Sequence, residues 1–265
     1  MKHILLSLLL AFNLIAAVIK APILSVDSEN SQATIKLERV DVGVSGFIVH
    51  TISQNHTSIL KNVHVIAYDK ESKIATLQMD EFNALQNNAL PTGKWQVQVG
   101  DSVELAFGYS RALLVSPSEE IYHQITKSVK VQWVHVDIFA TILSYRGHPT
   151  PLKDDFEAMS IASSVGLLFI YLDQKLYTID IKSFVILNIS EAPLVQDSVK
   201  LPFYSRVETI EANWWGEGSD ELEDYEPHYY GLLVESNSKN RKLYEIIKQS
   251  DEKNHFLLEN FELGE

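Results

Sequence analysis

The chain of 265 residues contains no cysteine, which excludes disulfide bonds, thiolate metal sites and a lipid-modified N-terminal cysteine. Positive charge is also scarce, with 22 lysine and arginine residues against 35 aspartate and glutamate residues. Binding to nucleic acid or to anionic lipid depends on basic patches, so both kinds of partner are disfavoured. No Gly-rich phosphate loop, internal repeat or long Pro/Gly/Ser linker is present. A folded protein of this composition must depend on its apolar core, and a chain of this length can bury one.

The N-terminus has the pattern of a secretory signal peptide. A short basic start precedes an apolar run from Ile4 to Ala11, and small residues follow it. We predict that residues 1–21 form the signal peptide; Ala17 suits the cleavage position better than Ala21, because a proline follows Ala21. The alternative is a retained membrane anchor, which needs about 20 apolar residues, and Lys20 interrupts the run. Export to the periplasm or cell surface is therefore expected, with no integral membrane segment after cleavage.

The first half of the mature chain is expected to be rich in β-strands. Residues 22–32 are polar and predict a flexible tether, and residues 33–117 predict a β-rich sandwich or small barrel. Asp80 is a candidate N-cap for a helix over residues 81–90. The expected strands are 34–37, 46–52, 59–68, 74–79, 95–99 and 103–109, the last two joined as a hairpin by Gly100 and Asp101.

The second half alternates between helical and strand patterns. Residues 118–211 predict an α/β layer domain, because amphipathic helices alternate with strands. Ser118 caps one helix, and Gly147 ends another. The wholly apolar run from Leu167 to Leu172 is typical of a central strand. Residues 212–265 form an acidic-aromatic loop and a C-terminal segment, in which we expect a strand over 231–235 and a helix over 242–248. The predicted fold class is α+β.

Several runs carry a resemblance to a known family. They are FNALQNNALP, VGDSVELAFGYSRALLVSP and VGVSGFIVH in the first half, with GLLFIYLDQKLYTID and LPFYSRVETI following in the same order and spacing. Together they resemble the N-terminal domain of the plasminogen-binding proteins of epsilonproteobacteria, over roughly residues 33–215. The shared residues are caps, turns and core positions, so the resemblance supports fold and family more than an activity.

No set of residues has the spacing of a catalytic or metal site. Ser58 and Lys61 match a Ser-x-x-Lys motif, which needs a helix, whereas this segment predicts a strand. His135 and Asp137 fit a strand end followed by a helix N-cap at Asp137 better than a base beside a nucleophile or substrate. Three histidines, His50, His56 and His64, fall within fifteen residues. We interpret them as a chance grouping across a sheet rather than a zinc site. We expect no enzyme activity, no cofactor and no metal.

The most unusual segment runs from Glu211 to Gly231. It carries seven carboxylates, no lysine or arginine, and five aromatic residues, among them Trp214 and Trp215. Aromatic side chains among carboxylates suit a loop that meets a partner or a cation. The alternative is a solvated loop whose aromatic side chains pack back on the domain.

The resemblance implies capture of host plasminogen, whose kringle domains bind lysine, best at a chain end. By resemblance, the longer members place this capacity in a lysine-rich C-terminal extension, whereas this chain ends at Glu265. The remaining candidates for partner binding are internal lysines near the end, namely Lys239, Lys242, Lys248 and Lys253. The first hypothesis is a non-catalytic envelope protein that captures plasminogen. The second is a periplasmic structural or scaffold protein that shares the domain, does not bind plasminogen and contacts another envelope protein. A third, an envelope hydrolase, has the least support.

Overall fold

The computed structural model describes residues 18–82, 95–195 and 198–264. Within it the chain divides into two compact units, with the boundary between Tyr109 and Ser110. The sequence placed this boundary near residue 117. The difference arises because Arg111–Val115 is strand β7, which pairs with strands of the second unit and therefore belongs to its sheet.

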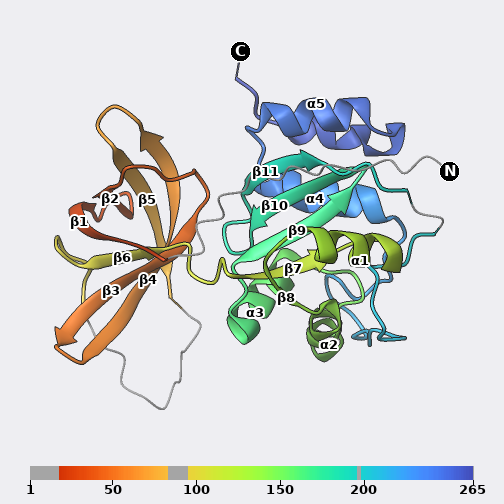
Figure 1. Cartoon of the computed structure of the whole chain (residues 1–265), viewed down its shortest axis with the longest axis horizontal. Coiled ribbons are helices and arrows are strands. Elements are labelled where there is room, and N and C mark those ends of the chain that lie inside the picture. Colours follow the sequence, from red (N-terminus) through yellow and green to blue (C-terminus); the bar gives the residue numbers. More distant parts are fainter. Residues whose placement is uncertain (1–17, 83–94, 196–197, 265) are drawn as a thin grey trace. The chain divides into compact units, whose positions relative to one another are not determined.

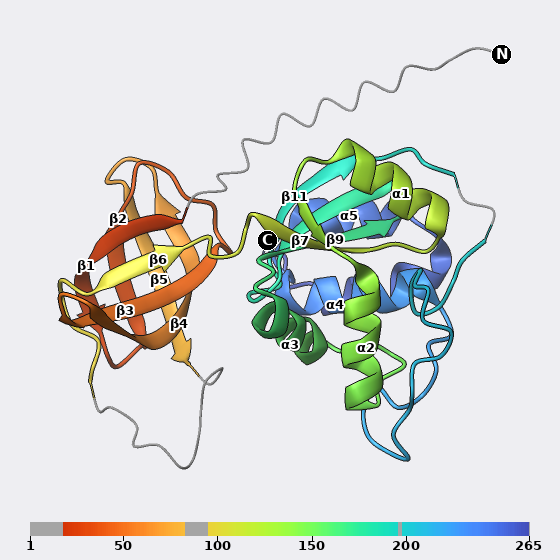
Figure 2. The same cartoon turned by 60° about the horizontal axis from the view of Figure 1, so that its bottom comes forward.

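The first unit is a closed six-stranded barrel, which confirms the barrel among the alternatives predicted from sequence. The strands follow the order β1-β2-β5-β4-β3-β6, and β6 pairs with β1 to close the ring (Figure 2). All of these pairings are antiparallel. The strands are β1 (Ile19–Asp27), β2 (Gln32–Lys36), β3 (Ser45–Ser53), β4 (His56–Asp69), β5 (Ile74–Glu81) and β6 (Ser102–Leu105).

Alternating apolar side chains fill the barrel interior. Along each strand every second side chain points inward, so one face of the pleat forms the core while the other meets water. The innermost side chains are Ile23, Ala33, Ile35, Ile48, Val63, Val65, Ala75, Leu77, Val103 and Leu105, all at most 2% exposed.

Strand β1 occupies residues expected to form the end of a signal peptide (1–21) and a flexible tether (22–32). Ala21 and Ile23 point into the core, and β1 pairs with β2 on one side and β6 on the other. A register shift between Ile23 and Ser25 breaks the alternation, and this hid the strand from the sequence pattern. The part of the predicted signal peptide over residues 1–17 lies outside the described residues.

Two predicted features around the barrel are wrong. Asp80 is not a helix N-cap, because β5 continues to Glu81; most of the helix predicted over 81–90 lies outside the described residues. Residues 95–99 form no strand, although their side chains alternate. The carboxylate of Asp101 instead accepts from the Gln98 amide at 2.9 Å and fixes a turn. Strand β6 therefore pairs with β1 and β3 rather than with residues 95–99.

The second unit is built on a five-stranded sheet in the order β11-β10-β9-β7-β8 (Figure 1). Strands β7, β8 and β9 run parallel, whereas β10 and β11 form an antiparallel extension. Helix α1 lies on one side of the sheet and helices α2 and α3 on the other (Figure 2). These elements are β8 (Gln132–Val134), β9 (Leu167–Leu172), β10 (Lys175–Asp180), β11 (Ile186–Glu191), α1 (Glu119–Ser128), α2 (Val136–Arg146) and α3 (Lys153–Ser163).

Several sequence predictions for this unit are confirmed. Ser118 caps α1, and its hydroxyl accepts from the Ile121 amide. Gly147 ends α2 in the left-handed conformation at a φ of 74°. All six residues of β9 are buried, as expected for a central strand covered on both faces. The α+β fold class is therefore observed, with a barrel followed by an α/β unit.

The C-terminal segment is helical and belongs to the second unit. It consists of α4 (Tyr225–Ser236), α5 (Arg241–Gln249) and a 3₁₀ segment, η1 (Glu252–Asn260), which packs against both helices. The strand predicted over 231–235 is wrong, because Leu232, Leu233 and Val234 form the buried side of α4, which packs on β9. The second unit therefore extends beyond residue 211, where the sequence had ended it. No helix among the described residues has the length and apolarity needed to cross a bilayer.

Candidate functional site

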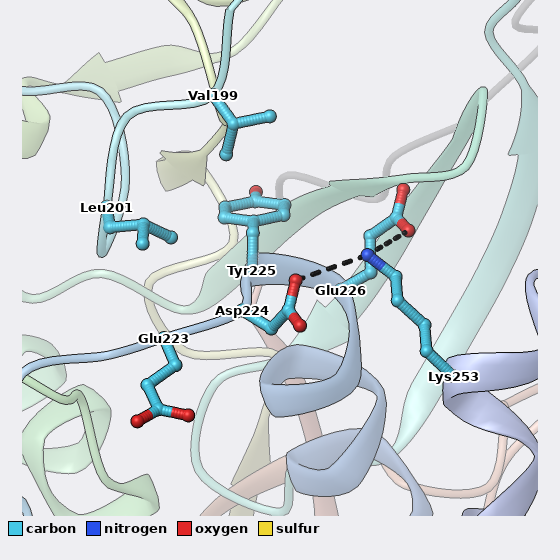
Figure 3. A pocket seen from close by; sticks show the side chains of 7 residues that line it. All are labelled: Val199, Leu201, Glu223, Asp224, Tyr225, Glu226 and Lys253. Atoms are coloured by element: carbon cyan, nitrogen blue, oxygen red, sulfur yellow. Dashed lines mark hydrogen bonds and ion pairs between the residues drawn. The ribbon is translucent and has the colours of Figure 1, made fainter.

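One of the predicted partner-binding lysines lies in a pocket at the start of α4. The pocket has a volume of about 240 Å³ and is bordered by α4, η1 and the segment before the acidic-aromatic stretch (Figure 3). Three carboxylates and one ammonium group give it a net negative charge. Its lining residues are Val199, Leu201, Glu223, Asp224, Tyr225, Glu226 and Lys253.

Lys253 is held in place by two of these carboxylates. Its Nζ lies 3.3 Å from Asp224 Oδ1 and 3.5 Å from Glu226 Oε2, and its side chain is 39% exposed. Burial alone would lower the pKa of Lys253, but the hydrogen bond to Asp224 and the nearby charge of Glu226 outweigh it and raise the pKa. The ammonium group is therefore charged and already neutralised within the pocket, which leaves it poorly placed to enter a pocket of a partner.

Tyr225 forms the wall of this pocket behind Lys253. Its side chain is buried, its hydroxyl has no hydrogen-bond partner among the described residues, and burial raises its pKa well above the usual value. A neutral hydroxyl without a partner is costly in a protein interior. The ion pairs of Lys253 join η1 to the start of α4 at this pocket.

The other three predicted lysines lie around the turn between α4 and α5 and along α5. The Nζ of Lys242 donates to the carbonyl of Ile189 at 3.2 Å, which ties α5 to β11. Lys239 lies in the turn, and Lys248 lies in the last turn of α5. Both are exposed, and within the described part of the chain neither takes part in an ion pair. Lys239 and Lys248 are therefore the two of the four whose ammonium groups are free to meet a partner.

The acidic-aromatic segment divides into a buried part and an exposed part. Tyr225, Tyr229 and Tyr230 lie on α4 and are at most 4% exposed, so they belong to the core. Trp214 and Trp215 precede the helix and are 97% and 84% exposed. Each of the two alternatives weighed from sequence therefore describes part of the segment. Sequence reasoning missed Tyr145, which is 93% exposed and lies at the C-terminal end of α2.

A polar cluster lies where the parallel strands β7 and β8 end, beside a cleft of about 500 Å³. Asp137 accepts hydrogen bonds from the Ser205 hydroxyl at 3.0 Å and from the guanidinium Nε of Arg206 at 2.7 Å. Burial alone would raise the pKa of Asp137, but hydrogen bonds from the Arg206 amide and guanidinium outweigh it and lower the pKa. His135 is the N-cap of α2 and accepts from the Asp137 amide, and its burial lowers its pKa. The N-cap predicted at Asp137 is wrong by two residues, because α2 begins at Val136 and His135 caps it. Asp137, in the first turn, instead joins α2 to Ser205 and Arg206.

The polar motifs of the barrel are also separate from one another. His50 Nδ1 lies 2.7 Å from Asp101 Oδ1, and the His50 ring stacks on Trp95. His56 and His64 have partners of their own, Ser53 and Asp80 respectively. In the described ranges no three His, Asp or Glu side chains are grouped so that they could hold a metal ion.

The Ser-x-x-Lys motif lies on strand β4, as the sequence indicated. Lys61 forms an ion pair with Glu81 of β5, and the Ser58 hydroxyl donates to a backbone carbonyl. Lys61 therefore pairs with a carboxylate of the neighbouring strand and is not positioned by this motif to activate Ser58.

The fold and the site define an α+β protein made of a closed antiparallel barrel and a mixed α/β unit, with lysine and tryptophan side chains presented on the second unit. The chain belongs to the family described as plasminogen-binding protein pgbA N-terminal, whose model matches residues 18–233. This confirms the resemblance seen in the sequence.

Two relatives are proteins named plasminogen-binding protein PgbA from Helicobacter pylori. The protein of strain J99 is 26% identical over 202 residues, which is 75% of this chain and 44% of the relative. The protein of strain 26695 is 26% identical over 204 residues, which is 76% of this chain and 44% of the relative. The chain thus spans less than half the length of these relatives. No solved structure matches it.

The matched region includes one group of candidate residues, the tryptophans, and excludes the other, the lysines. It includes the barrel, the sheet and the tryptophan pair, and it ends inside α4 at residue 233. Lys239, Lys242, Lys248 and Lys253 all follow it. Family membership therefore supports the scaffold and leaves the lysines to be judged on their geometry alone.

Proposed function

We propose that this chain is an exported, non-catalytic envelope protein that captures plasminogen through exposed lysine side chains. The observation that carries the proposal is the family match over residues 18–233, together with the printed names of the two relatives. The apolar N-terminal run and the cysteine-free, acidic composition support export to the periplasm or cell surface.

The geometry supports Lys239 and Lys248 as the contact residues. A lysine-binding pocket must surround the ammonium group, so a lysine engaged in an internal ion pair would first have to lose that pair. Lys253 is held by Asp224 and Glu226, and Lys242 donates to β11. Lys239 and Lys248 form no ion pair within the described part of the chain, so binding would not require either lysine to break one.

A paired set of variants tests this assignment. We expect the Lys239→Ala/Lys248→Ala double variant to bind immobilised plasminogen about tenfold more weakly than the parent chain, since two charged contacts are lost. Lys127→Ala is the matched control, because Lys127 is an exposed lysine of α1 in the same unit. Equal binding by the double variant and the control would contradict the assignment.

A second candidate is a periplasmic scaffold protein that shares the domain but does not bind plasminogen. It is favoured by one observation: the match covers 44% of each relative and stops before the candidate lysines. Protease treatment of intact cells separates the two locations. Digestion of the protein on intact cells supports surface capture. If the protein is digested only after the outer membrane is permeabilised, the periplasmic scaffold is supported.

A further inference from the structure

Two adjacent tryptophans are fully presented to solvent on the second unit. Trp214 and Trp215 are 97% and 84% exposed, and Tyr145, at the end of α2 to which their segment is bonded, is 93% exposed. Burial of a large aromatic side chain is strongly favourable, so leaving two of them in water forgoes that stabilisation. Single exposed apolar residues are common, whereas two adjacent exposed tryptophans favour a surface that meets a partner.

The segment that carries the tryptophans is fixed to the connection between α2 and α3. Before the pair, the Asn213 amide donates to the Gly147 carbonyl at 3.0 Å, and its side chain donates to the Arg146 carbonyl at 2.7 Å. After the pair, the Thr150 amide donates to the Gly218 carbonyl at 3.1 Å, and the Thr150 hydroxyl donates to the Asp220 carbonyl at 2.7 Å. The tryptophans are therefore held on a braced loop, and binding would cost little loop ordering.

The glycines at these contacts leave room for nothing larger. A Cβ on Gly147 would lie 2.2 Å from Asn213 Cγ, and one on Gly218 would lie 2.9 Å from the Thr150 carbonyl oxygen. Both residues also have positive φ, which favours glycine. The close approach of the loop to the α2–α3 connection is thus specified by the sequence.

The segment that carries the tryptophans is acidic and has no basic residue of its own. No lysine or arginine occurs between Arg206 and Lys239. Asp224 and Glu226 pair with Lys253. Five further carboxylates of the segment are in no ion pair within the described part of the chain: Glu211, Glu217, Asp220, Glu221 and Glu223. Such a surface repels anionic partners and attracts cationic ones.

We propose that Trp214, Trp215 and Tyr145, with the carboxylates beside them, form a docking surface for a basic, extended segment of a partner protein. Arginine or lysine side chains of that segment would lie over the indole faces, where the ring quadrupole attracts a cation. The unpaired carboxylates would supply the opposite charge. This surface is separate from the lysines of α5: α2 and α5 lie on opposite sides of the second unit (Figure 1). The proposal therefore stands or falls independently of plasminogen capture.

Fluorescence anisotropy with a labelled peptide of alternating arginine and glycine tests the surface on the full chain. We expect saturable binding that weakens as salt is raised, and binding about tenfold weaker for Trp214→Ala/Trp215→Ala. The melting temperature of this variant should equal that of the parent, because both rings lie in water. Phe256→Ala is the matched control, since Phe256 is a 62% exposed aromatic residue of η1, and it should bind as the parent does.

Two further probes complete the experiment. A peptide of alternating glutamate and glycine should not bind, and Glu217→Gln/Glu221→Gln should weaken binding of the arginine peptide. Binding of that peptide with equal strength to the parent and the tryptophan variant would overturn the proposal, and so would its failure to bind at all. Binding of a chitin oligosaccharide in place of the basic peptide would also overturn it, because the tryptophans would then be a sugar-stacking platform.

Discussion

Asp137 joins α2 to the segment that follows the sheet, and four interactions converge on its carboxylate region. The Arg206 amide and guanidinium, the Ser205 hydroxyl and the neighbouring His135 ring all lie within hydrogen-bond or ion-pair distance. Because the carboxylate is only 20% exposed, these contacts are partly shielded from solvent. The ionisation of Asp137 therefore bears on stability at the scale of a single residue.

The lowered pKa of Asp137 predicts an acid-sensitive contribution to stability. An unfolded aspartate titrates near a pKa of about 3.9, and the folded value lies below it. The unfolded state therefore binds the proton more readily, so the contribution is present above about pH 4 and is lost as the pH falls through the folded pKa. We expect Asp137→Asn to melt below the parent at pH 7, with the difference in melting temperature narrowing as the pH falls below about 4.

Thermal melts of both proteins across this pH range provide the measurement. Asp154→Asn is the control, because Asp154 is an exposed carboxylate in the first turn of α3. A gap between the parent and Asp137→Asn that stays constant from pH 7 to pH 3 would show that the charge of Asp137 is not the stabilising feature.

Sequence patterns predicted the caps and missed the surface chemistry of single residues. Ser118 and Gly147 were predictable because a cap depends on its own residue type and its immediate neighbours. The ion pair that holds Lys253 was not, since Asp224 and Glu226 are more than 25 positions away in the sequence. Tyr145 could have been found: the helical spacing of Phe139, Ala140 and Leu143 places it on the opposite face of α2.

At the scale of elements, closure of the barrel depends on how closely β3 and β6 approach. Gly46 of β3 lies opposite Leu105 of β6, and a Cβ at this position would lie 2.1 Å from the Glu104 carbonyl oxygen. This clash would be with a backbone oxygen, so it cannot be relieved by rotating a side chain, and the backbone itself would have to move. A glycine in a strand interior commonly marks such a close approach of another backbone.

We expect Gly46→Ala to destabilise the barrel by about 2 kcal/mol or more, because the β3–β6 pairing must separate to admit the methyl group. Urea unfolding followed by circular dichroism measures the loss. Gly264→Ala is the control, since nothing lies within 4 Å of its would-be Cβ. An unchanged unfolding midpoint for Gly46→Ala would mean that this pairing does not close the barrel in solution.

Strand β1 bears on where an exported chain would be processed. Ile19, Lys20 and Ala21 pair with Leu105, Glu104 and Val103 of β6, and Ala21 is buried. Cleavage after Ala21 would remove these three pairings, whereas cleavage after Ala17 would leave β1 whole. We therefore predict that the exported protein begins at Val18, which the intact mass of the purified mature protein measures. A mature chain that begins at Pro22 would contradict this prediction.

Elements were predictable where their pattern was regular and local. The strands of the barrel core and the buried strand β9 follow simple periodicities, and both were predicted. Strand β1 was missed because a register shift breaks its alternation. Residues 95–99 alternate in the way that predicts a strand, but pairing is decided by distant partners, and β6 pairs with β1 and β3 instead. The order of strands in a closed barrel is not a local property of the sequence.

At the scale of the whole molecule, the chain is a family scaffold with candidate contacts on its second unit. The matched region includes the complete barrel and all five strands of the second sheet. The lysines proposed to meet plasminogen lie beyond it, on the turn before α5 and on α5 itself. Family membership and plasminogen capture are therefore separate statements, and the second requires its own measurement.

Binding of the purified, unsubstituted chain to immobilised plasminogen, with free lysine as competitor, tests the central claim most directly. If exposed lysines enter the kringle pockets, binding should saturate with increasing chain concentration, and free lysine should displace it in a dose-dependent manner. Glycine at the same concentration, with sodium chloride added to match the ionic strength, should leave it unchanged, because glycine lacks the side-chain ammonium group. Binding that does not saturate, or that free lysine does not displace, would contradict plasminogen capture by this chain.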